Sequence, residues 1–146
     1  MIYIIIGQFL ILFILILVLN FKQNMKLTDL EGIPISSTFP YNKLNLIEQK
    51  NYIICLSTSC PHCRKIVEEI QSLNFNTSNI YIIFSEEENV VSNYLEQYDN
   101  LNFEYLSDVL VEDVYITTTP FVYVLNENEI IINKKVIKTV ASLDIV

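Results

Sequence analysis

The chain opens with an almost unbroken apolar run, after which short apolar segments alternate with polar connections. Residues 2–21 are hydrocarbon apart from a few softer positions. A run of about 20 such residues forms roughly 30 Å of α-helix, which matches the thickness of a bilayer core. This pattern predicts one transmembrane helix over residues 1–21, a polar tether over 22–32 and one folded domain over 33–146.

A cleaved signal peptide is the main alternative for the apolar run. Signal peptides usually carry an apolar region of about 7–15 residues that ends in small side chains. Here the run is longer, and it ends in Asn20-Phe21 without small residues or a directly following cysteine. An uncleaved anchor is therefore the favoured interpretation.

Two apolar runs in the predicted domain are typical of strands buried on both faces. They cover residues 52–56 and 80–84 and are rich in β-branched side chains. Each is followed by apolar residues at helical spacing, which predicts two strand-helix units. The residues at this spacing are Ile66, Val67, Ile70 and Leu73 in the first helix, and Val90, Val91, Tyr94, Leu95 and Tyr98 in the second.

The rest of the domain completes a mixed pattern. Residues 85–88, Ser-Glu-Glu-Glu, are typical of a capping sequence with acids at a helix start. A short strand near 103–106 and a helical turn near 109–115 follow. Two further strands, at 121–125 and 130–134, are separated by a polar turn and predict a β-hairpin. The residues that remain allow at most a short final helix. This order predicts an α/β domain with a mixed central sheet flanked by helices.

The charge distribution excludes one class of partner. The chain has a formal net charge of −8, and residues 1–21 contain no Asp, Glu, Lys, Arg or His. The folded part is therefore acidic, and no cluster of Lys or Arg offers a compensating patch. Such a surface repels phosphate backbones, so we expect no nucleic-acid partner.

Two cysteines stand where the first predicted strand gives way to its helix. Cys60 follows the strand, and Pro61 takes the first turn of the helix, where proline is favoured. A thiol at a helix N-terminus faces unpaired N–H groups and the positive end of the helix dipole, which both stabilise the thiolate. Cys63 lies about one turn further inward. We therefore expect Cys60 to form the mixed disulfide with a substrate and Cys63 to resolve it.

Other uses of these cysteines are less well supported. Structural zinc needs four ligands, and the remaining candidates are Cys55 and His62. Cys55 lies within a predicted strand and is expected to be a small buried apolar residue. A purely structural disulfide between Cys60 and Cys63 would restrain little chain entropy. Apart from that redox-active pair, the sequence predicts no cofactor and no metal.

The segment 53–65, which contains Cys60-Pro61-His62-Cys63, resembles the active-site strand, loop and helix start of thioredoxin-like proteins. It is most similar to the membrane-tethered TlpA and methylamine-utilisation branches of that superfamily. Residues 119–126 resemble the superfamily's cis-proline loop and the strand after it, and the resemblance covers roughly residues 30–140. It implies a thioredoxin-like fold and a thiol-disulfide oxidoreductase activity.

The same resemblance implies further site residues. Pro120 is expected to follow a cis peptide bond and to face the disulfide. Thr119 is expected to present its backbone N–H and C=O beside Cys60, where an extended substrate pairs with them. The sequence also departs from the superfamily. Ile54 occupies the position of the buried Asp of thioredoxins, so proton transfer at Cys63 must use water or another carboxylate.

His62 gives the only sequence signal for the direction of the reaction. The Pro-His dipeptide is similar to that of the DsbA-type oxidases, and the ring is expected to donate a hydrogen bond to the sulfur of Cys60. A stabilised thiolate favours the reduced enzyme and makes it a stronger oxidant. Oxidation or isomerisation is therefore favoured over reduction, which stays open.

A metal-binding role is the alternative from a different functional class. The same two cysteines are soft ligands that suit copper delivery. Such a site usually needs a further His or Met, and both methionines lie in or near the predicted anchor.

The expected partners are exported proteins or peptides with cysteines, and a membrane redox partner that recycles the pair. Two observations bear on the orientation of the domain, and they point in opposite directions. Lys22 and Lys26 follow the span, which by the positive-inside rule favours a cytoplasmic domain. Long domains are translocated largely regardless of charge, however, and disulfides persist outside the cytoplasm. We therefore expect a single-pass protein of the cell membrane with its domain outside.

Overall fold

The computed structural model separates into two compact units, Met1–Glu31 and Gly32–Val146. The residues that it describes are 2–41, 44, 46, 48–72, 77–99, 101 and 103–143, with side chains described at 6–20, 22 and 31 in the first unit. Leu73, which the helical spacing placed in the first predicted helix, and the last three residues of the chain lie outside the described residues.

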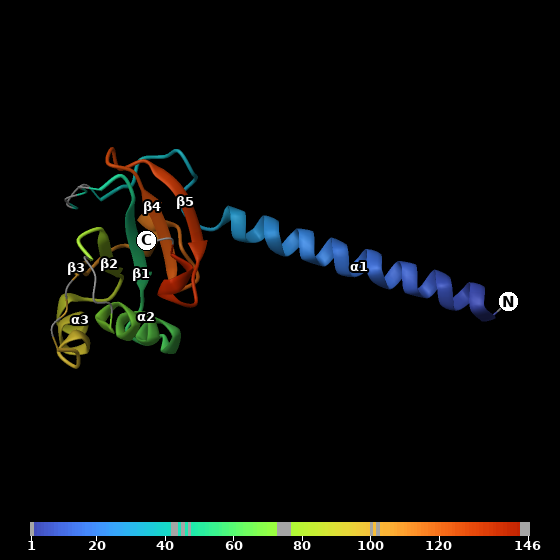
Figure 1. Cartoon of the computed structure of the whole chain (residues 1–146), viewed down its shortest axis with the longest axis horizontal. Helices are drawn as coiled ribbons and strands as arrows, with labels where there is room; N and C mark the ends of the chain where they lie inside the picture. Colours follow the sequence, from blue (N-terminus) through green and yellow to red (C-terminus); the bar gives the residue numbers. More distant parts are fainter. Residues whose placement is uncertain are drawn as a thin grey trace. The chain divides into compact units, whose positions relative to one another are not determined.

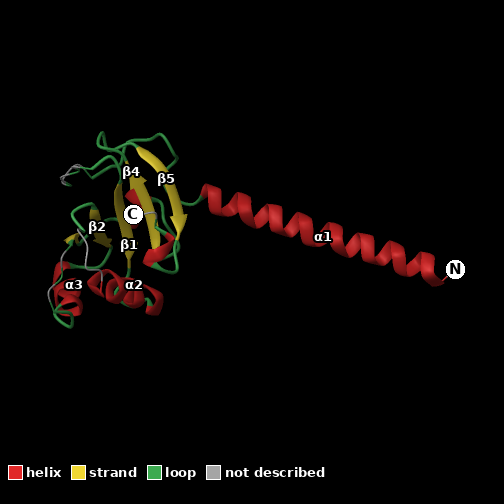
Figure 2. Cartoon of the chain, in the orientation of Figure 1, coloured by secondary structure: helices red, strands yellow, loops and turns green. Residues whose placement is uncertain are grey.

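The first unit is a single helix, α1 (Ile2–Leu30), which also takes in most of the segment predicted as a tether (Figure 2). The described side chains of α1 are exposed. Within the part of the chain that the structure describes, no helix is both long enough and apolar enough to cross a membrane. The span predicted over residues 1–21 is not confirmed by this finding and stays a prediction.

The second unit is built on a five-stranded mixed sheet with the order β3-β2-β1-β4-β5 (Figure 1). Parallel pairing joins β1 to β2 and β2 to β3, whereas β4 runs antiparallel to both β1 and β5. The strands are β1 (Asn51–Leu56), β2 (Ile80–Phe84), β3 (Glu104–Leu106), β4 (Phe121–Leu125) and β5 (Ile131–Val136). The predicted mixed sheet and the β4-β5 hairpin are confirmed.

The helices of this unit are short and follow the strands as the sequence pattern predicts. They are α2 (Pro61–Ser72), α3 (Glu88–Leu95), α4 (Val111–Val114) and a final 3₁₀ turn, η1 (Val140–Ser142). The predicted capping sequence is wrong in one respect. The residue before α3 is Glu87, and its side chain makes no capping hydrogen bond. Glu86 turns elsewhere, as described below.

The period of two along the strands divides the core between the two faces of the sheet. In β1, Tyr52, Ile54 and Leu56 belong to the cluster that packs with α2 and α3, whereas Ile53 and Cys55 belong to the cluster on the other face. All six residues of β1 are buried, which is the burial expected for a central strand. The sheet thus has an apolar layer on each side.

The start of the second unit is held against the sheet by a close approach of backbone to side chain. Gly32 has φ +78°, and a Cβ at this position would lie 2.5 Å from the hydroxyl oxygen of Tyr123. That hydroxyl accepts a hydrogen bond from the Ile33 N–H at 2.9 Å and donates one to the carbonyl of Val114. Glycine is therefore required here for both conformation and space.

Candidate functional site

The turn between β1 and α2 places Cys60 at the start of a helix. β1 ends at Leu56, and Cys60 directly precedes Pro61, the first residue of α2. The Cys60 carbonyl accepts hydrogen bonds from the N–H groups of Cys63 at 3.1 Å and Arg64 at 3.3 Å, which opens the helical ladder. The thiol is therefore beside the N–H groups that a helix leaves unpaired at its first turn.

These N–H groups favour the thiolate of Cys60. Burial acts to raise the pKa of this thiol, but hydrogen bonds from the thiol and the N–H of Cys63, from Thr119 and from the His62 N–H outweigh it. The pKa of Cys60 consequently lies below the ordinary value for a cysteine. The side chain is half-buried, so it stays accessible to a partner.

Cys63 has the opposite character. Its side chain is only 1% exposed and lies within the cluster that packs α2 against the sheet. Burial, followed by the hydrogen bond with Cys60, raises its pKa to about 12, although the N–H of Ser57 donates to its sulfur at 3.5 Å and acts the other way. One half-buried thiol with a lowered pKa and one buried thiol with a raised pKa thus lie within hydrogen-bonding distance of each other.

The loop before β4 lies next to this pair. The Thr119–Pro120 peptide bond is cis, as the resemblance implied. The carbonyl oxygen of Thr119 accepts a hydrogen bond from the Cys60 thiol at 3.6 Å. The structure therefore brings together Cys60, Cys63 and Thr119, which come from segments almost sixty residues apart, and Pro120 follows Thr119 directly.

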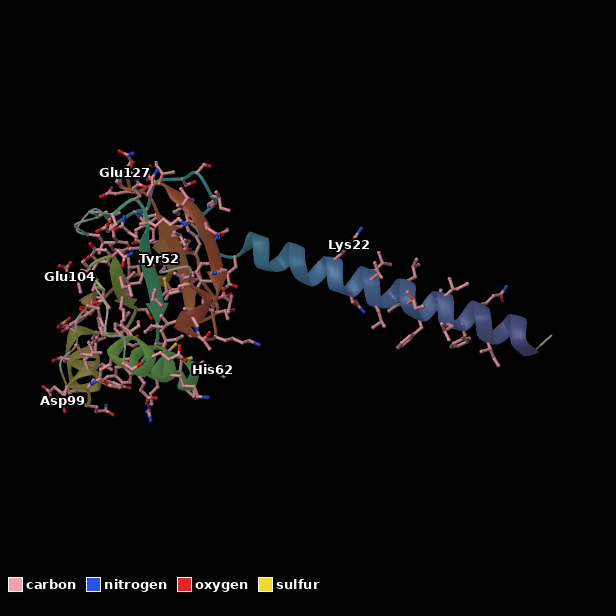
Figure 3. All side chains as sticks on the ribbon, in the orientation of Figure 1. Lys22, Tyr52, His62, Asp99, Glu104 and Glu127 are labelled. Atoms are coloured by element: carbon pink, nitrogen blue, oxygen red, sulfur yellow. The ribbon has the colours of Figure 1, made fainter. Side chains whose placement is uncertain are left out.

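His62 does not make the contact expected from the sequence. Its side chain is exposed at the start of α2, where Figure 3 shows it at the edge of the domain. Among the described residues its ring has no hydrogen bond with Cys60, and the contribution to the Cys60 thiolate comes from the His62 backbone N–H. The second position of a helix points this N–H toward the thiol and leaves the ring in solvent.

The third cysteine lies apart from this chemistry. Cys55 is 1% exposed in β1 and packs on the face of the sheet opposite to Cys63. Burial raises its pKa far above the ordinary value, so the thiol stays protonated. Ile54, at the position of the thioredoxin Asp, is fully buried in the same cluster as Cys63 and offers no proton acceptor.

One charged residue of the site was missed at the level of sequence. Glu86 follows β2, and its Oε1 accepts hydrogen bonds from the Ser57 hydroxyl at 2.7 Å and the Thr58 N–H at 2.9 Å. A signal for this contact did exist. β1 and β2 are parallel, and their last residues, Leu56 and Phe84, are paired, so the turns after them lie at the same edge of the sheet.

An apolar cavity of about 260 Å³ opens beside the Thr119 loop. Its walls come from β1, β2 and the segment around α4, and Thr119 forms part of its edge. The lining residues include Cys55, Ile83, Val109, Val111, Val114 and Ile116. The cavity shares Thr119 with the site, whereas Cys60 and Cys63 are not among its lining residues.

The described residues were also considered as ligands of a metal ion. In the described part of the chain, no group of three or more His, Cys, Asp or Glu side chains is placed to hold a metal ion. The copper-delivery alternative therefore gains no third ligand from these residues.

Comparison with known proteins identifies the fold of the second unit. No protein-family model and no curated protein matches the sequence. Among solved structures, a domain of a possible thiol-disulfide isomerase from Cytophaga hutchinsonii is similar, with a TM-score of 0.57 and 14% identity over 71% of this chain and 85% of that one. The thioredoxin domain of a thiol-disulfide oxidoreductase from Bacteroides vulgatus gives 0.53 and 15% identity over 70% and 88%. The second unit therefore has a thioredoxin-like fold.

Proposed function

We propose that this chain is a thiol-disulfide oxidoreductase in which Cys60 exchanges disulfides with protein substrates and Cys63 resolves the mixed disulfide. The observation that carries the proposal is that the pKa values of two neighbouring thiols are shifted in opposite directions. The pKa of Cys60, at a helix start, is lowered, and the pKa of Cys63 is raised by burial. The thiolate is the nucleophile and the better leaving group, so the shifts assign different roles to the two cysteines. The thiol-disulfide activities named for the two solved structures above support the same reaction class.

The exchange balances without any cofactor. In the oxidising direction a substrate thiolate attacks Cys60 in the Cys60–Cys63 disulfide, and the sulfur of Cys63 leaves and takes up a proton. A second substrate thiolate then attacks the substrate sulfur of the mixed disulfide, and Cys60 leaves as a thiolate. Two electrons pass from the substrate dithiol to the cysteine pair, and reduction is the reverse sequence.

The lowered pKa of Cys60 favours the oxidising direction. A stabilised thiolate makes the reduced enzyme the preferred form and makes Cys60 a good leaving group. His62 contributes through its backbone N–H, so a smaller effect of its ring is expected than the resemblance to DsbA-type oxidases implied. The reduction potential of the pair is therefore expected to be higher than it would be if Cys60 had the ordinary pKa of a cysteine.

The Thr119 loop and the cavity beside it suit an extended polypeptide substrate. Thr119 already accepts a hydrogen bond from Cys60, so a chain that pairs with its backbone groups as an added strand brings its own sulfur to that thiol. The apolar cavity next to Thr119 offers space for a neighbouring apolar side chain of the substrate. The substrates in this proposal are exported proteins or peptides with cysteines.

Turnover by the purified full-length chain tests the activity. The expected result is formation of disulfides in a reduced model protein and, with a thiol reductant, reduction of an insulin-like disulfide substrate. Equilibration with glutathione buffers gives the reduction potential of the pair. If the Cys60→Ser variant retained both reactions, the proposal would be contradicted, because no other described thiol is both accessible and activated.

Membrane anchoring through residues 2–21, with the domain outside the cytoplasmic membrane, belongs to the same proposal. It rests on the apolar run and on the persistence of disulfides in that compartment. In this location a membrane redox partner recycles the cysteine pair. A membrane-impermeant thiol reagent is expected to label reduced Cys60 in intact cells. Labelling only after lysis would place the domain in the cytoplasm.

A further inference from the structure

Glu86 reaches from the turn after β2 to the turn after β1. Its Oε1 accepts three hydrogen bonds, from the Ser57 hydroxyl at 2.7 Å, the Thr58 N–H at 2.9 Å and the Thr58 hydroxyl at 3.3 Å. A carboxylate that accepts from several donors forms charge-assisted bonds, which are stronger than neutral ones. The turn that leads to Cys60 is therefore tied to the neighbouring strand-helix unit.

The tied turn contacts both cysteines through Ser57. The Ser57 N–H donates to the sulfur of Cys63 at 3.5 Å, and the Ser57 carbonyl accepts from the Cys60 N–H at 3.2 Å. The Ser57 hydroxyl that binds Glu86 belongs to the same residue as both of these backbone groups. A displacement of Ser57 thus alters a hydrogen bond at each cysteine.

The second oxygen of Glu86 argues against a role in stability alone. Oε2 is buried, and among the described residues it has no hydrogen-bond partner. A buried acceptor without a partner costs free energy, on the order of 1–3 kcal/mol in general. The two acids that follow behave differently, since Glu87 is exposed and Glu88 accepts a hydrogen bond from the Tyr105 hydroxyl on the surface.

We infer that Glu86 is a positioning residue of the redox site, which holds Ser57 where its N–H meets the sulfur of Cys63. The inference rests on the proposed function and adds to it the residue that keeps the resolving cysteine ready. The N–H of Ser57 stabilises the negative charge that Cys63 carries when it attacks the mixed disulfide. Because Ile54 supplies no carboxylate next to Cys63, this hydrogen bond is one of few that assist its ionisation.

The effect on the two cysteines is expected to differ. The Cys60 thiolate is stabilised by hydrogen bonds from Cys63, from Thr119 and from the His62 N–H, and Glu86 makes no hydrogen bond with any of these residues. Loss of Glu86 therefore slows the attack by Cys63 and leaves the attack by Cys60 almost unchanged. A general loosening of the domain would change both.

A two-step reaction with an aromatic disulfide reagent separates these attacks. Reduced Cys60 attacks the reagent, forms a mixed disulfide and releases one coloured aromatic thiolate. Cys63 then loses its proton and attacks Cys60, which forms the Cys60–Cys63 disulfide and releases a second coloured thiolate. The rates of the two releases report Cys60 and Cys63 separately, in the full-length chain and without any protein substrate.

Three variants make the comparison. In Glu86→Ala the second release is expected to be roughly three- to tenfold slower, the range for one weakened hydrogen bond, with the first release within about twofold of the wild type. Glu86→Gln keeps an acceptor for Ser57 and Thr58 and is expected to restore most of the second rate. Glu87→Ala, at the exposed neighbour, is the matched control and is expected to change neither rate. Thermal unfolding of each variant shows whether the fold is intact.

Three outcomes would overturn the inference. Equal slowing of both releases in Glu86→Ala would show a general structural role. An unchanged second release in a folded Glu86→Ala would show that Ser57 stays in place without the carboxylate. A Glu86→Gln variant as slow as Glu86→Ala would assign proton transfer rather than positioning to Glu86. Failure of the proposed function is a separate result, because the two releases are measured even if no protein substrate is turned over.

Discussion

Two strand-helix turns of this protein lie at the same edge of the sheet and have different roles in the candidate site. The turn after β1 contains Ser57 to Ser59 and ends at Cys60, directly before α2. The turn after β2 contains Ser85 to Glu87 and ends directly before α3. The paired ends of the two parallel strands, Leu56 and Phe84, start both turns at the same level.

The difference lies in what each turn places at its helix start. The first turn places a thiol beside the N–H groups at the start of α2, and hydrogen bonds from these groups lower the pKa of that thiol. The second turn places acids there, and of these Glu86 crosses to the first turn and binds Ser57 and Thr58. Similar local geometry thus yields a reactive group in one turn and a support for that group in the other.

The largest effect is expected from removing the thiol of the first turn. Cys60→Ser is expected to abolish disulfide exchange, because no other accessible thiolate is available. Cys63→Ser is expected to accumulate mixed disulfides through Cys60, which non-reducing electrophoresis detects. Glu87→Ala in the second turn is the matched control and is expected to retain full exchange. Residual turnover in Cys60→Ser would place the chemistry outside the first turn.

The pH dependence of alkylation sharpens the contrast within the first turn. At pH 7 a thiol with a pKa of about 12 is ionised to about one part in 10⁵, whereas the lowered pKa of Cys60 gives that thiol a much larger thiolate fraction. Reduced Cys60 is therefore expected to react faster than Cys63 with an uncharged alkylating reagent, because its thiolate fraction is larger and its side chain is less buried. Mass spectrometry of the modified peptides measures both rates.

The two shifted pKa values also make the stability of the reduced folded protein depend on pH. The depressed pKa of Cys60 stabilises the reduced folded form above the ordinary pKa of a cysteine, and this contribution is lost as the pH falls through the lowered pKa. The raised pKa of Cys63 destabilises the reduced folded form only at pH values above the ordinary pKa of a cysteine.

Similar alkylation rates for the two cysteines would contradict the proposed division of roles.

A smaller effect, on stability alone, is expected from replacing Glu88, whose side chain makes no hydrogen bond with the turn after β1. Glu88 lies in the first turn of α3, where it interacts with the helix dipole and accepts hydrogen bonds from Tyr105 and Ser107. Glu88→Ala is expected to lower the free energy of unfolding by up to about 1 kcal/mol, which urea denaturation measures. Exchange by this variant is expected to equal that of the wild type, in contrast to Glu86→Ala. Slower exchange would show that the second turn acts on the site through more than Glu86.

Little effect on exchange is also expected from replacing the cysteine of β1. Cys55 is buried on the other face of the sheet with a protonated thiol, so Cys55→Ala is expected to change the exchange rate by less than about twofold. The loss of a small buried side chain still lowers stability moderately. Turnover and urea denaturation of the same preparation separate the two effects. A strong loss of turnover in a folded variant would mean that the mechanism uses three cysteines.

The sequence by itself determined the parts of this protein that depend on local pattern. Buried strands, helical stripes and the hairpin follow from periods of two and of about 3.6 residues, which are visible within one segment. The placement of Cys60 before a helix follows from the same patterns, because Pro61 marks the helix start. The cis bond before Pro120 came from the resemblance of its segment, and the structure confirms it.

Only the tertiary structure decided the contacts between these segments. The order of the strands brings Glu86 to Ser57, although the acids after β2 looked like a simple cap in the sequence. Burial separates the pKa of Cys63 from that of Cys60, and the start of α2 directs the His62 N–H rather than its ring to the thiol. Strand order, burial and hydrogen bonds over long sequence distances depend on how the elements pack, and the period of one segment carries no information about its neighbours.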